Sequence, residues 1–555
     1  MEIRQLRIQN FRGFVNVVWH PHAGINCLIG PGDSGKSTVL DAIALLLAPR
    51  RPSVTEYDYR GRRAEDGFLI EAVLGDVRDL LAALGTPCVQ GWRGGAVVPI
   101  PEGDDEPVLV VRVVGTEDIE VDHQIVRADD STEMFRNASR AALGLIRVDT
   151  STRAAAELRL VRGSLLSQRV GQASVRNELA AQLAALSEHL DLPEDTAAAV
   201  AAIADAFQAV GLTRDVALGL LAEASGSIIG MLALHAAWNE GVWLPFSSSG
   251  AGSRQTALFA LASALPGDDR TIVVDEPETG LEPYRQRDRV ARLRDLVTGH
   301  GQVFMTTHAP AVVASLRAGE LWRIAGHQAP IDVSPPALAA LIKNDGEALL
   351  SRLPLICEGE TEQGILDVVL PALAQAGGHA SPWGGGVHLV DGGGNSSAVR
   401  LAMDLCAMDI DCGLLVDDEI TDRGRRAQVL ADARCAGVAW DNGENLEAVV
   451  AREVPLNRLD DLVAASALLG ARLNTRLEDL GEALGHRQRL TAADQVQQHS
   501  ETAVRQALSR AMHECGWFKT RAGGRQLGTF LLDCGLPGEV GVKLKELWTR
   551  VSLHL

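Results

Sequence analysis

The amino-acid sequence predicts an α/β protein in which two different parallel-sheet parts follow one another along the chain. An apolar run at 25–29 leads into a glycine-rich loop, and a segment with helical periodicity, 38–47, leaves it. A second apolar run, 271–274, ends directly in two acidic residues. From 351 to 419, strand-like and helix-like segments alternate, and acidic residues stand at the strand ends.

Length and composition indicate a soluble protein of several domains. The chain has 555 residues, of which 46% are hydrophobic and 22% charged, so we expect two to four domains. No apolar run approaches the roughly 20 residues of a membrane helix. The N-terminus does not resemble a signal peptide, and the eight cysteines show no C-x-x-C spacing. We therefore expect a cytoplasmic protein, and its net charge of −20 means that any contact with nucleic acid is local.

The glycine-rich loop has the sequence of a phosphate-binding loop. Residues 30–37 read Gly-Pro-Gly-Asp-Ser-Gly-Lys-Ser, which is the pattern G-x-x-x-x-G-K-S between a strand and a helix. Backbone N–H groups of such a loop surround a phosphate chain, and the helix N-terminus adds a partial positive charge. Lys36 is expected to reach the β- and γ-phosphates, and the Ser37 hydroxyl to bind Mg²⁺.

Two segments after this loop have no motif of their own. The connector that holds Arg60, Arg62 and Arg63 is a solvated loop or a patch that contacts DNA. Residues 153–225 are rich in Ala and Leu with helical periodicity, and we interpret them as a helical insertion. The insertion serves as scaffold or, because some of its helices are apolar on more than one face, as a dimerisation element.

Three further motifs complete the expected nucleotide site. Ser249 and Gly250 begin a Ser-Gly-x-Gly sequence ahead of a helix. Asp275 is expected to hold Mg²⁺ through water, and Glu276 to orient the attacking water. His308 ends another strand, at a distance that suits a sensor of the γ-phosphate.

Together these motifs resemble an ABC-type ATPase of the SMC, RecF and Rad50 type, over about residues 1 to 345. The resemblance implies that the signature of one subunit meets the γ-phosphate bound by another, hence a homodimer with ATP between the subunits. The residues expected to bind ATP and Mg²⁺ are Arg12, Gly30, Gly32, Gly35, Lys36, Ser37, Thr38, Ser249, Gly250, Asp275 and His308, with Glu276 as the catalytic carboxylate.

The second part of the chain carries acids with a spacing suited to metal binding. Glu358 and Glu362 are four residues apart at a strand–helix turn, and Asp417 and Glu419 are two apart at a strand end. Four converging carboxylates repel one another unless a cation binds, and oxygen ligands suit Mg²⁺ or Mn²⁺. Two ions would stabilise the attacking and leaving oxygens of a phosphodiester.

These acids resemble the metal site of a Toprim domain, in which the first-strand glutamate and a D-x-D pair bind the metal. Here Asp418 intervenes and the second acid is Glu419, so either one could be the ligand; strand geometry favours Glu419. Tyr57, Tyr59 and Tyr284 are the three tyrosines, and none stands in a context suited to strand attack, which argues against a topoisomerase.

An ABC-type ATPase followed by Toprim resembles the OLD (overcoming lysogenization defect) nuclease family and its phage-defence relatives, such as the nuclease subunit of the Gabija system. That resemblance implies an ATP-dependent, two-metal DNA endonuclease, with Mg²⁺, Mn²⁺ or Ca²⁺, and the possibility of a UvrD-like helicase partner. A late lysine supports the phosphate chemistry in the family, and Lys519, one of only five lysines, is the matching residue. Glu447 is a weaker extra ligand candidate.

The expected domains are an ATPase in two parts, 1–152 and 226–345, the insertion 153–225, and a Toprim domain at 350–555 with a helical stretch at about 456–512. The alternative function is an ATPase scaffold in DNA repair whose Toprim domain only binds. The sequence leaves open dimer or tetramer, and whether ATP activates or inhibits cleavage.

Overall fold

The computed structural model divides the chain into two compact units, Met1–Pro335 and Pro336–Leu555. The residues that the structure describes are 1–48, 54–77, 80, 82, 84, 86–148, 157–160, 164–170, 193–210, 212, 215–220, 232–239, 242–264, 270–418, 423–441, 443–467 and 472–555. The sequence analysis ended the ATPase part at 345. The structure places α11 (Ala339–Asn344) and α12 (Glu347–Leu350) in the second unit, where His388 of the second sheet hydrogen-bonds Asp345 between them at 2.9 Å.

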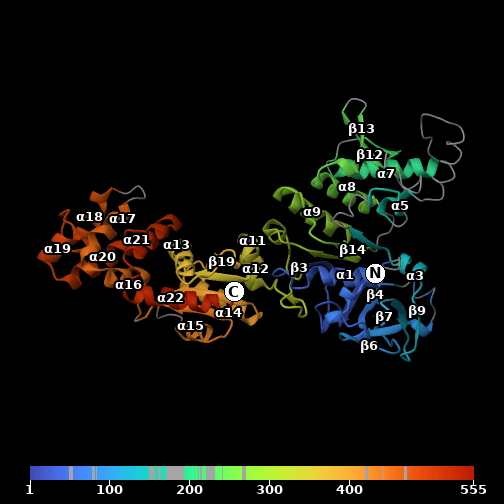
Figure 1. The fold of residues 1–555 in the computed structure, drawn as a ribbon, viewed down its shortest axis with the longest axis horizontal. Helices are drawn as coiled ribbons and strands as arrows, with labels where there is room; N and C mark the ends of the chain where they lie inside the picture. The colour runs from blue at the N-terminus through green and yellow to red at the C-terminus, as the bar shows by residue number, and fades with distance from the viewer. Residues whose placement is uncertain are drawn as a thin grey trace. The chain divides into compact units, whose positions relative to one another are not determined.

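A parallel sheet forms the centre of the first unit (Figure 1), in the order β10-β14-β15-β3-β16-β17. Every residue of β15 is buried, as expected for a strand inside a sheet that is covered on both faces. The first five strands are parallel, and β17 pairs antiparallel to β16. The strands are β3 (Gly24–Ile29), β10 (Leu145–Val148), β14 (Arg270–Val274), β15 (Gly301–Thr306), β16 (Leu321–Arg323) and β17 (Ile331–Asp332).

An antiparallel sheet packs beside it through a shared hydrophobic core. Its order is β2-β1-β4-β7-β5-β6, with β8 paired to β7 and β9 to β8. Residues 3–8, 68–74 and 108–114, which are rich in apolar side chains, all lie in this sheet. Its members are β1 (Glu2–Gln9), β2 (Asn16–Trp19), β4 (Phe68–Gly75), β5 (Gln90–Arg93), β6 (Ala96–Val98), β7 (Glu106–Gly115), β8 (Val121–Val126) and β9 (Thr132–Met134).

The expected helical insertion is helical only in part of its described length. It contains α5 (Leu165–Val170) and α7 (Glu194–Ala209), but Val216–Leu220 is a strand, β11. Its antiparallel pairing with β12 (Leu232–Asn239), which in turn pairs with β13 (Val242–Pro245), explains the difference. Residues 171–192 lie outside the described residues. The other helices of this unit are α1 (Lys36–Leu47), α3 (Asn137–Ala142), α8 (Ala251–Ala264), α9 (Pro283–Leu296) and α10 (Pro310–Val313).

The second unit is a four-stranded parallel sheet, β19-β18-β20-β21, to which a helical region is added. Its strands are β18 (Leu353–Cys357), β19 (Val387–Asp391), β20 (Cys412–Val416) and β21 (Cys435–Ala439). Residues of β18 and β20 are all buried. The remaining helices are α13 (Glu360–Ala376), α14 (Asn395–Ala407), α15 (Arg423–Leu430), α16 (Leu446–Glu453), α17 (Leu459–Ala467), α18 (Leu473–Ala483), α19 (Ala492–Gln498), α20 (Glu501–Glu514), α21 (Arg521–Asp533) and α22 (Gly538–Ser552).

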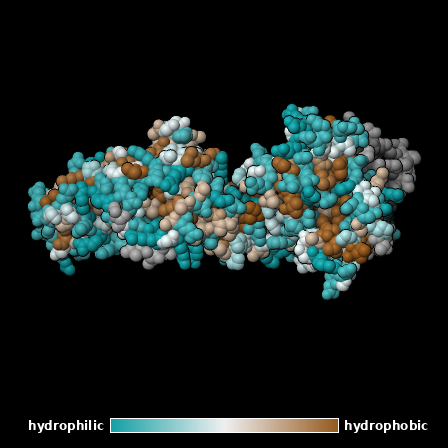
Figure 2. All heavy atoms as spheres, turned by 90° about the horizontal axis from the view of Figure 1, so that it is seen from below, coloured by the Kyte–Doolittle hydropathy of each residue, from teal (hydrophilic) through white to brown (hydrophobic). Residues whose placement is uncertain are grey.

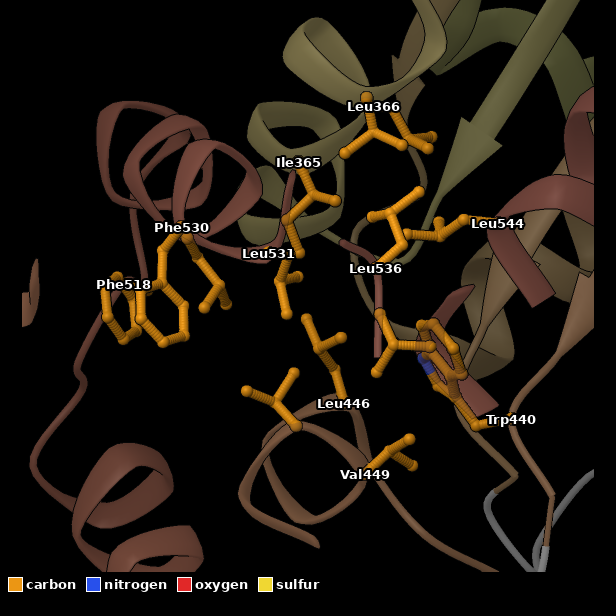
Figure 3. Packing of buried hydrophobic residues seen from close by; sticks show 14 of the residues in the cluster. Ile365, Leu366, Trp440, Leu446, Val449, Phe518, Phe530, Leu531, Leu536 and Leu544 are labelled. Carbon is orange, nitrogen blue, oxygen red and sulfur yellow. The ribbon is translucent and has the colours of Figure 1, made fainter. Parts of the chain in front are cut away.

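One hydrophobic core joins the sheet of the second unit to its late helices. Figure 3 shows Ile365 and Leu366 of α13 facing Leu531 of α21 and Leu536, with Leu446 and Val449 of α16 on the opposite side. The core therefore fixes segments that are far apart in the sequence.

The surface of both units is largely hydrophilic on the face drawn in Figure 2, with scattered hydrophobic patches. Within the described residues, no helix combines the length and the apolar character that crossing a membrane requires.

Candidate functional sites

The phosphate-binding loop has the expected strand–loop–helix setting, between β3 and α1. Gly30 has a φ of 145°, and a Cβ there would lie 2.1 Å from the Ile324 carbonyl oxygen, so only glycine fits. The Lys36 ammonium donates to the carbonyl oxygens of Gly30 at 2.9 Å and Pro31 at 2.8 Å. Burial lowers the pKa of Lys36, although Asp275, Glu276 and Asp33 oppose that shift. A bound phosphate would supply the opposite charge that this ammonium needs.

Asp275 meets the loop because β14 and β3 both flank β15, and parallel strands end at the same edge. The Ser37 hydroxyl donates to the Asp275 carboxylate at 3.3 Å. The Thr306 hydroxyl, at the end of β15, also donates to it. The two oxygens predicted to bind Mg²⁺ are thus neighbours.

Glu276 and His308 also come together. Their side chains approach to 3.8 Å between Glu276 Oε1 and His308 Nε2, and both are about half exposed. Glu276 has a φ of 48°, which a glutamate adopts at a cost, and its N–H donates to the Thr306 hydroxyl at 3.1 Å. This backbone strain is typical of functional positions.

The sequence analysis missed Glu278, which holds the strand end that carries His308. Its buried carboxylate accepts from the Thr307 hydroxyl and the His308 N–H, both at 2.8 Å. Burial raises the pKa of Glu278. In the sequence, only its position two residues after Glu276 could have indicated that Glu278 belongs to this site.

For three sets of residues predicted to bind ATP, the structure shows no contact that bears on that role. The Arg12 guanidinium bonds Asp58 at 2.9 Å and Asp41 of α1 at 2.7 Å, so its role toward ATP stays a prediction. Gly32 and Gly35 lie in the loop, and Thr38 lies in the first turn of α1. In the described part of the chain, Ser249 and Gly250 precede α8 and make no hydrogen bond to the loop.

The second site lies at the carboxyl edge of the parallel sheet of the second unit. Glu358 follows β18, and Asp417 follows the neighbouring β20. The Glu358 carboxylate accepts from the Asp417 N–H and from the Asn395 amide, both at 3.0 Å. Asn395 also donates to the Asp417 carbonyl oxygen at 2.8 Å, and its own buried Oδ1 has no hydrogen-bond partner. Sequence reasoning missed Asn395, although it follows three glycines at the end of β19.

Buried carboxylates perturb one another at this edge. Burial, together with the charges of Glu358, Glu362 and Glu447, raises the pKa of Asp417 to about 9. Burial, with smaller contributions from Glu358 and Glu447, raises the pKa of Glu362 to about 7. Such mutual repulsion is what a bound cation would relieve.

Lys519 reaches the same site from the segment before α21. Its ammonium forms an ion pair with the buried carboxylate of Glu447. Burial lowers the pKa of Lys519, but the hydrogen bond and charge of Glu447, and the charges of Glu362 and Asp417, raise it overall. His513 Nδ1 lies 3.8 Å from Glu447 Oε2, and no motif in the sequence indicates this position.

Of the two candidate metal ligands Asp418 and Glu419, the structure describes only Asp418. Asp418 forms an ion pair with the buried Arg426, lies 3.4 Å from Arg423, and accepts from the Gly443 N–H at 2.6 Å. It is therefore occupied by partners of its own. Glu419 lies outside the described residues.

Across the residues with described positions, no group of three or more His, Cys, Asp or Glu side chains is placed to hold a metal ion. By donor type, the set fits a hard divalent cation, because it offers carboxylates and the free amide oxygen of Asn395.

Two family models match the first unit. An "AAA ATPase domain" model matches residues 1–78, and a model described as "AAA domain, putative AbiEii toxin, Type IV TA system" matches residues 118–314. The DNA double-strand break repair Rad50 ATPase of Methanopyrus kandleri is 38% identical over 71 residues, which are 13% of this chain and 8% of that protein. The chain thus matches only a small part of that relative's length.

Solved structures that resemble the chain include two SMC heads and a RecF protein. The Thermotoga maritima SMC head domain has a TM-score of 0.31 at 13% identity and covers 60% of this chain and 100% of that one. The Pyrococcus furiosus Smc head bound to the C-terminal domain of ScpA has a TM-score of 0.38 at 12% identity, over 58% and 93%. The recombination mediator RecF gives 0.36 at 11% identity, over 59% and 97%. These low scores carry no argument about this chain.

The family matches and the phosphate-loop strand order agree on the first unit. The N-terminal unit of this chain contains an ATPase domain of the AAA/ABC type, and such domains bind ATP, typically with Mg²⁺.

Proposed function

We propose that this protein is an ATP-regulated, divalent-metal-dependent DNA endonuclease of the OLD type, with a Toprim domain as its second unit. The observation that carries the proposal is the grouping of buried acids with Lys519. Glu362, Asp417 and Glu447 influence one another's charge, and Lys519 pairs with Glu447. Functional sites are where such shifted pKa values gather.

The residues that would hold the metal are Glu358, Glu362 and Asp417, with Glu419 as a further candidate. Mg²⁺ or Mn²⁺ bound there would polarise a phosphodiester and lower the pKa of an attacking water. Lys519 would neutralise the charge that develops on the phosphate. Glu447 would keep the Lys519 ammonium charged and aimed at the acids, because their ion pair is half-buried.

The ATPase unit would act as a switch on this chemistry. Ser249 and Gly250 bond only within their own segment in the described structure, which leaves them available to ATP on a second copy. ATP would then close a homodimer in which each nucleotide contacts both chains. A role in phage defence, and a helicase partner, rest on the family resemblance alone.

A second candidate function follows from a specific observation. The described carboxylates do not form a ready group of three metal ligands. An ATPase scaffold of the DNA-repair type, with a second unit that binds DNA without cutting it, would need no such group.

Plasmid nicking separates the two functions. Supercoiled plasmid is incubated with Mg²⁺ or Mn²⁺, with and without ATP, and with Asp417→Asn or Asp418→Asn protein. The proposal expects metal-dependent nicking that Asp417→Asn abolishes and Asp418→Asn retains, because Asp418 faces Arg426. Equal loss in both folded variants would contradict the assignment of Asp417, and absence of nicking in every condition would favour the scaffold.

A further inference from the structure

A pocket of about 510 Å³ lies in the first unit between the end of α7, α8 and α9, away from the phosphate-binding loop. Figure 1 labels all three helices. Its lining combines the aromatic rings of Phe259 and Tyr284 with three arginines of α9, Arg285, Arg289 and Arg292. These arginines are four and three residues apart and share one helix face.

Arg289 is the unusual member of this set. Its side chain is only 5% exposed, and its guanidinium carbon lies 3.8 Å from the centre of the Phe259 ring. It donates one hydrogen bond, from Nη2 to the Thr256 hydroxyl at 3.3 Å, and its buried Nη1 has no hydrogen-bond partner. Among the described ion pairs none includes Arg289, although the charge of Asp288, which also lines the pocket, acts on it. Burial lowers its pKa to about 9, which reflects the cost of that charge.

The two arginines at the mouth are already paired. Arg285 lies 3.4 Å from Glu282 and donates to the Tyr284 hydroxyl at 3.0 Å. Arg292 lies 2.6 Å from Asp288. Both side chains are about half exposed. Carboxylates therefore offset the charges of these two arginines, and the unmet hydrogen-bonding capacity lies at Arg289.

We propose that this pocket binds an anionic small molecule, which places a phosphate or carboxylate group on Arg289 and an apolar body against Phe259 and Tyr284. The volume lies within the range of small-molecule sites. A guanidinium offers parallel N–H donors that match a phosphate or a carboxylate. Removing an unpaired charge from water is unfavourable unless a counter-charge joins it, and the ligand supplies that charge.

The position of the pocket connects it to ATP hydrolysis. Helix α8 begins directly after Ser249 and Gly250, and Leu281 and Tyr284 of the lining follow Asp275 and Glu276 by a few residues. A ligand in this pocket would therefore contact both helices that adjoin the ATPase motifs. This inference depends on the ATPase domain and not on the proposed nuclease.

Binding is measured by isothermal titration calorimetry in a Lys36→Ala background, so that anions do not bind the phosphate loop. The probes are phenyl phosphate, inorganic phosphate and benzoate, with phenol as the uncharged control. We expect one molecule of phenyl phosphate or of benzoate to bind per chain, and phenol not to bind. The anion that binds shows whether the pocket takes a phosphate or a carboxylate. Arg289→Met should weaken binding by about tenfold or more, as the loss of a charge-assisted bond implies.

The matched control is Arg287→Met, on the same helix but exposed and outside the pocket. It should bind like the parent protein. If Arg289→Met does not fold, as judged by circular dichroism, Arg289→Lys replaces it, and it should also weaken binding because an ammonium lacks the parallel N–H donors of a guanidinium. The proposal is overturned if no anion binds the parent protein, or if the pocket variant binds as tightly as Arg287→Met.

Discussion

The close crossing of α13 and α21 gives a prediction whose size can be worked out from the structure. A Cβ at Gly524 would lie 2.1 Å from the Thr361 carbonyl oxygen and 2.9 Å from Gly364 Cα, all of which is backbone. Because ordinary contact begins at 3.4 Å, Gly524→Ala forces the two helices apart by about 1 Å. Overpacking of this kind costs up to about 3 kcal/mol. Alanine returns about 1 kcal/mol through its helix propensity, so we expect a net loss of about 2 kcal/mol.

Gly528→Ala is the matched control, one turn further along α21. Its Cβ would lie 3.0 Å from the Ile365 carbonyl oxygen, which a shift of a few tenths of an ångström relieves. The gain in helix propensity then cancels the steric cost, and stability should change by less than about 0.5 kcal/mol.

The assay is hydrogen exchange of peptides that cover α13 and α21, followed through increasing urea, because exchange reports the local opening free energy in a protein of two units. Lys519 stands directly before the Thr520 N-cap of α21, so Gly524→Ala should also reduce nicking more than ATP hydrolysis. Equal exchange in the two variants would refute the close-packing argument.

Further predictions concern the two sites. Lys36→Ala should reduce ATP hydrolysis by about 100-fold or more, measured by phosphate release, because the ammonium is expected at the phosphates. The melting temperature of metal-free protein should fall as the pH rises. Glu362 and Asp417 keep their protons in the folded state, whereas the unfolded chain loses them at about pH 4. The stability that these protons contribute is therefore present below about pH 4, and it is lost by about pH 7 for Glu362 and about pH 9 for Asp417. Asp417→Asn should flatten that slope, and an unchanged slope would contradict the burial of this acid. Glu362→Gln should abolish nicking while Glu360→Gln, an exposed neighbour on α13, retains it.

The sequence predicted the strands best where burial on both faces leaves a continuous apolar run, as in β3, β14, β18 and β20. It also predicted one nucleotide site from Ser37, Asp275, Glu276 and His308, and in the structure Ser37 contacts Asp275 and Glu276 approaches His308. It did not predict Asn395, His513 or Glu278. Their roles depend on packing between segments far apart in the chain, which periodicity does not encode. The strand at 216–220 was missed because an Ala- and Leu-rich segment pairs as a strand only in the presence of β12.

The position of Lys519 shows how tertiary packing completes a site that the sheet alone leaves unfinished. The strand ends of β18 and β20 bring acids together, and Lys519 adds a positive charge from outside that sheet. Helix α21 packs against α13 through Gly364 and Gly524, and the core in Figure 3 holds α16 on the other side. These contacts bring Lys519, which precedes α21, and Glu447 of α16 to the acids. If the second unit is the proposed nuclease, a change in the packing of these helices is expected to alter its activity even where no acid is touched.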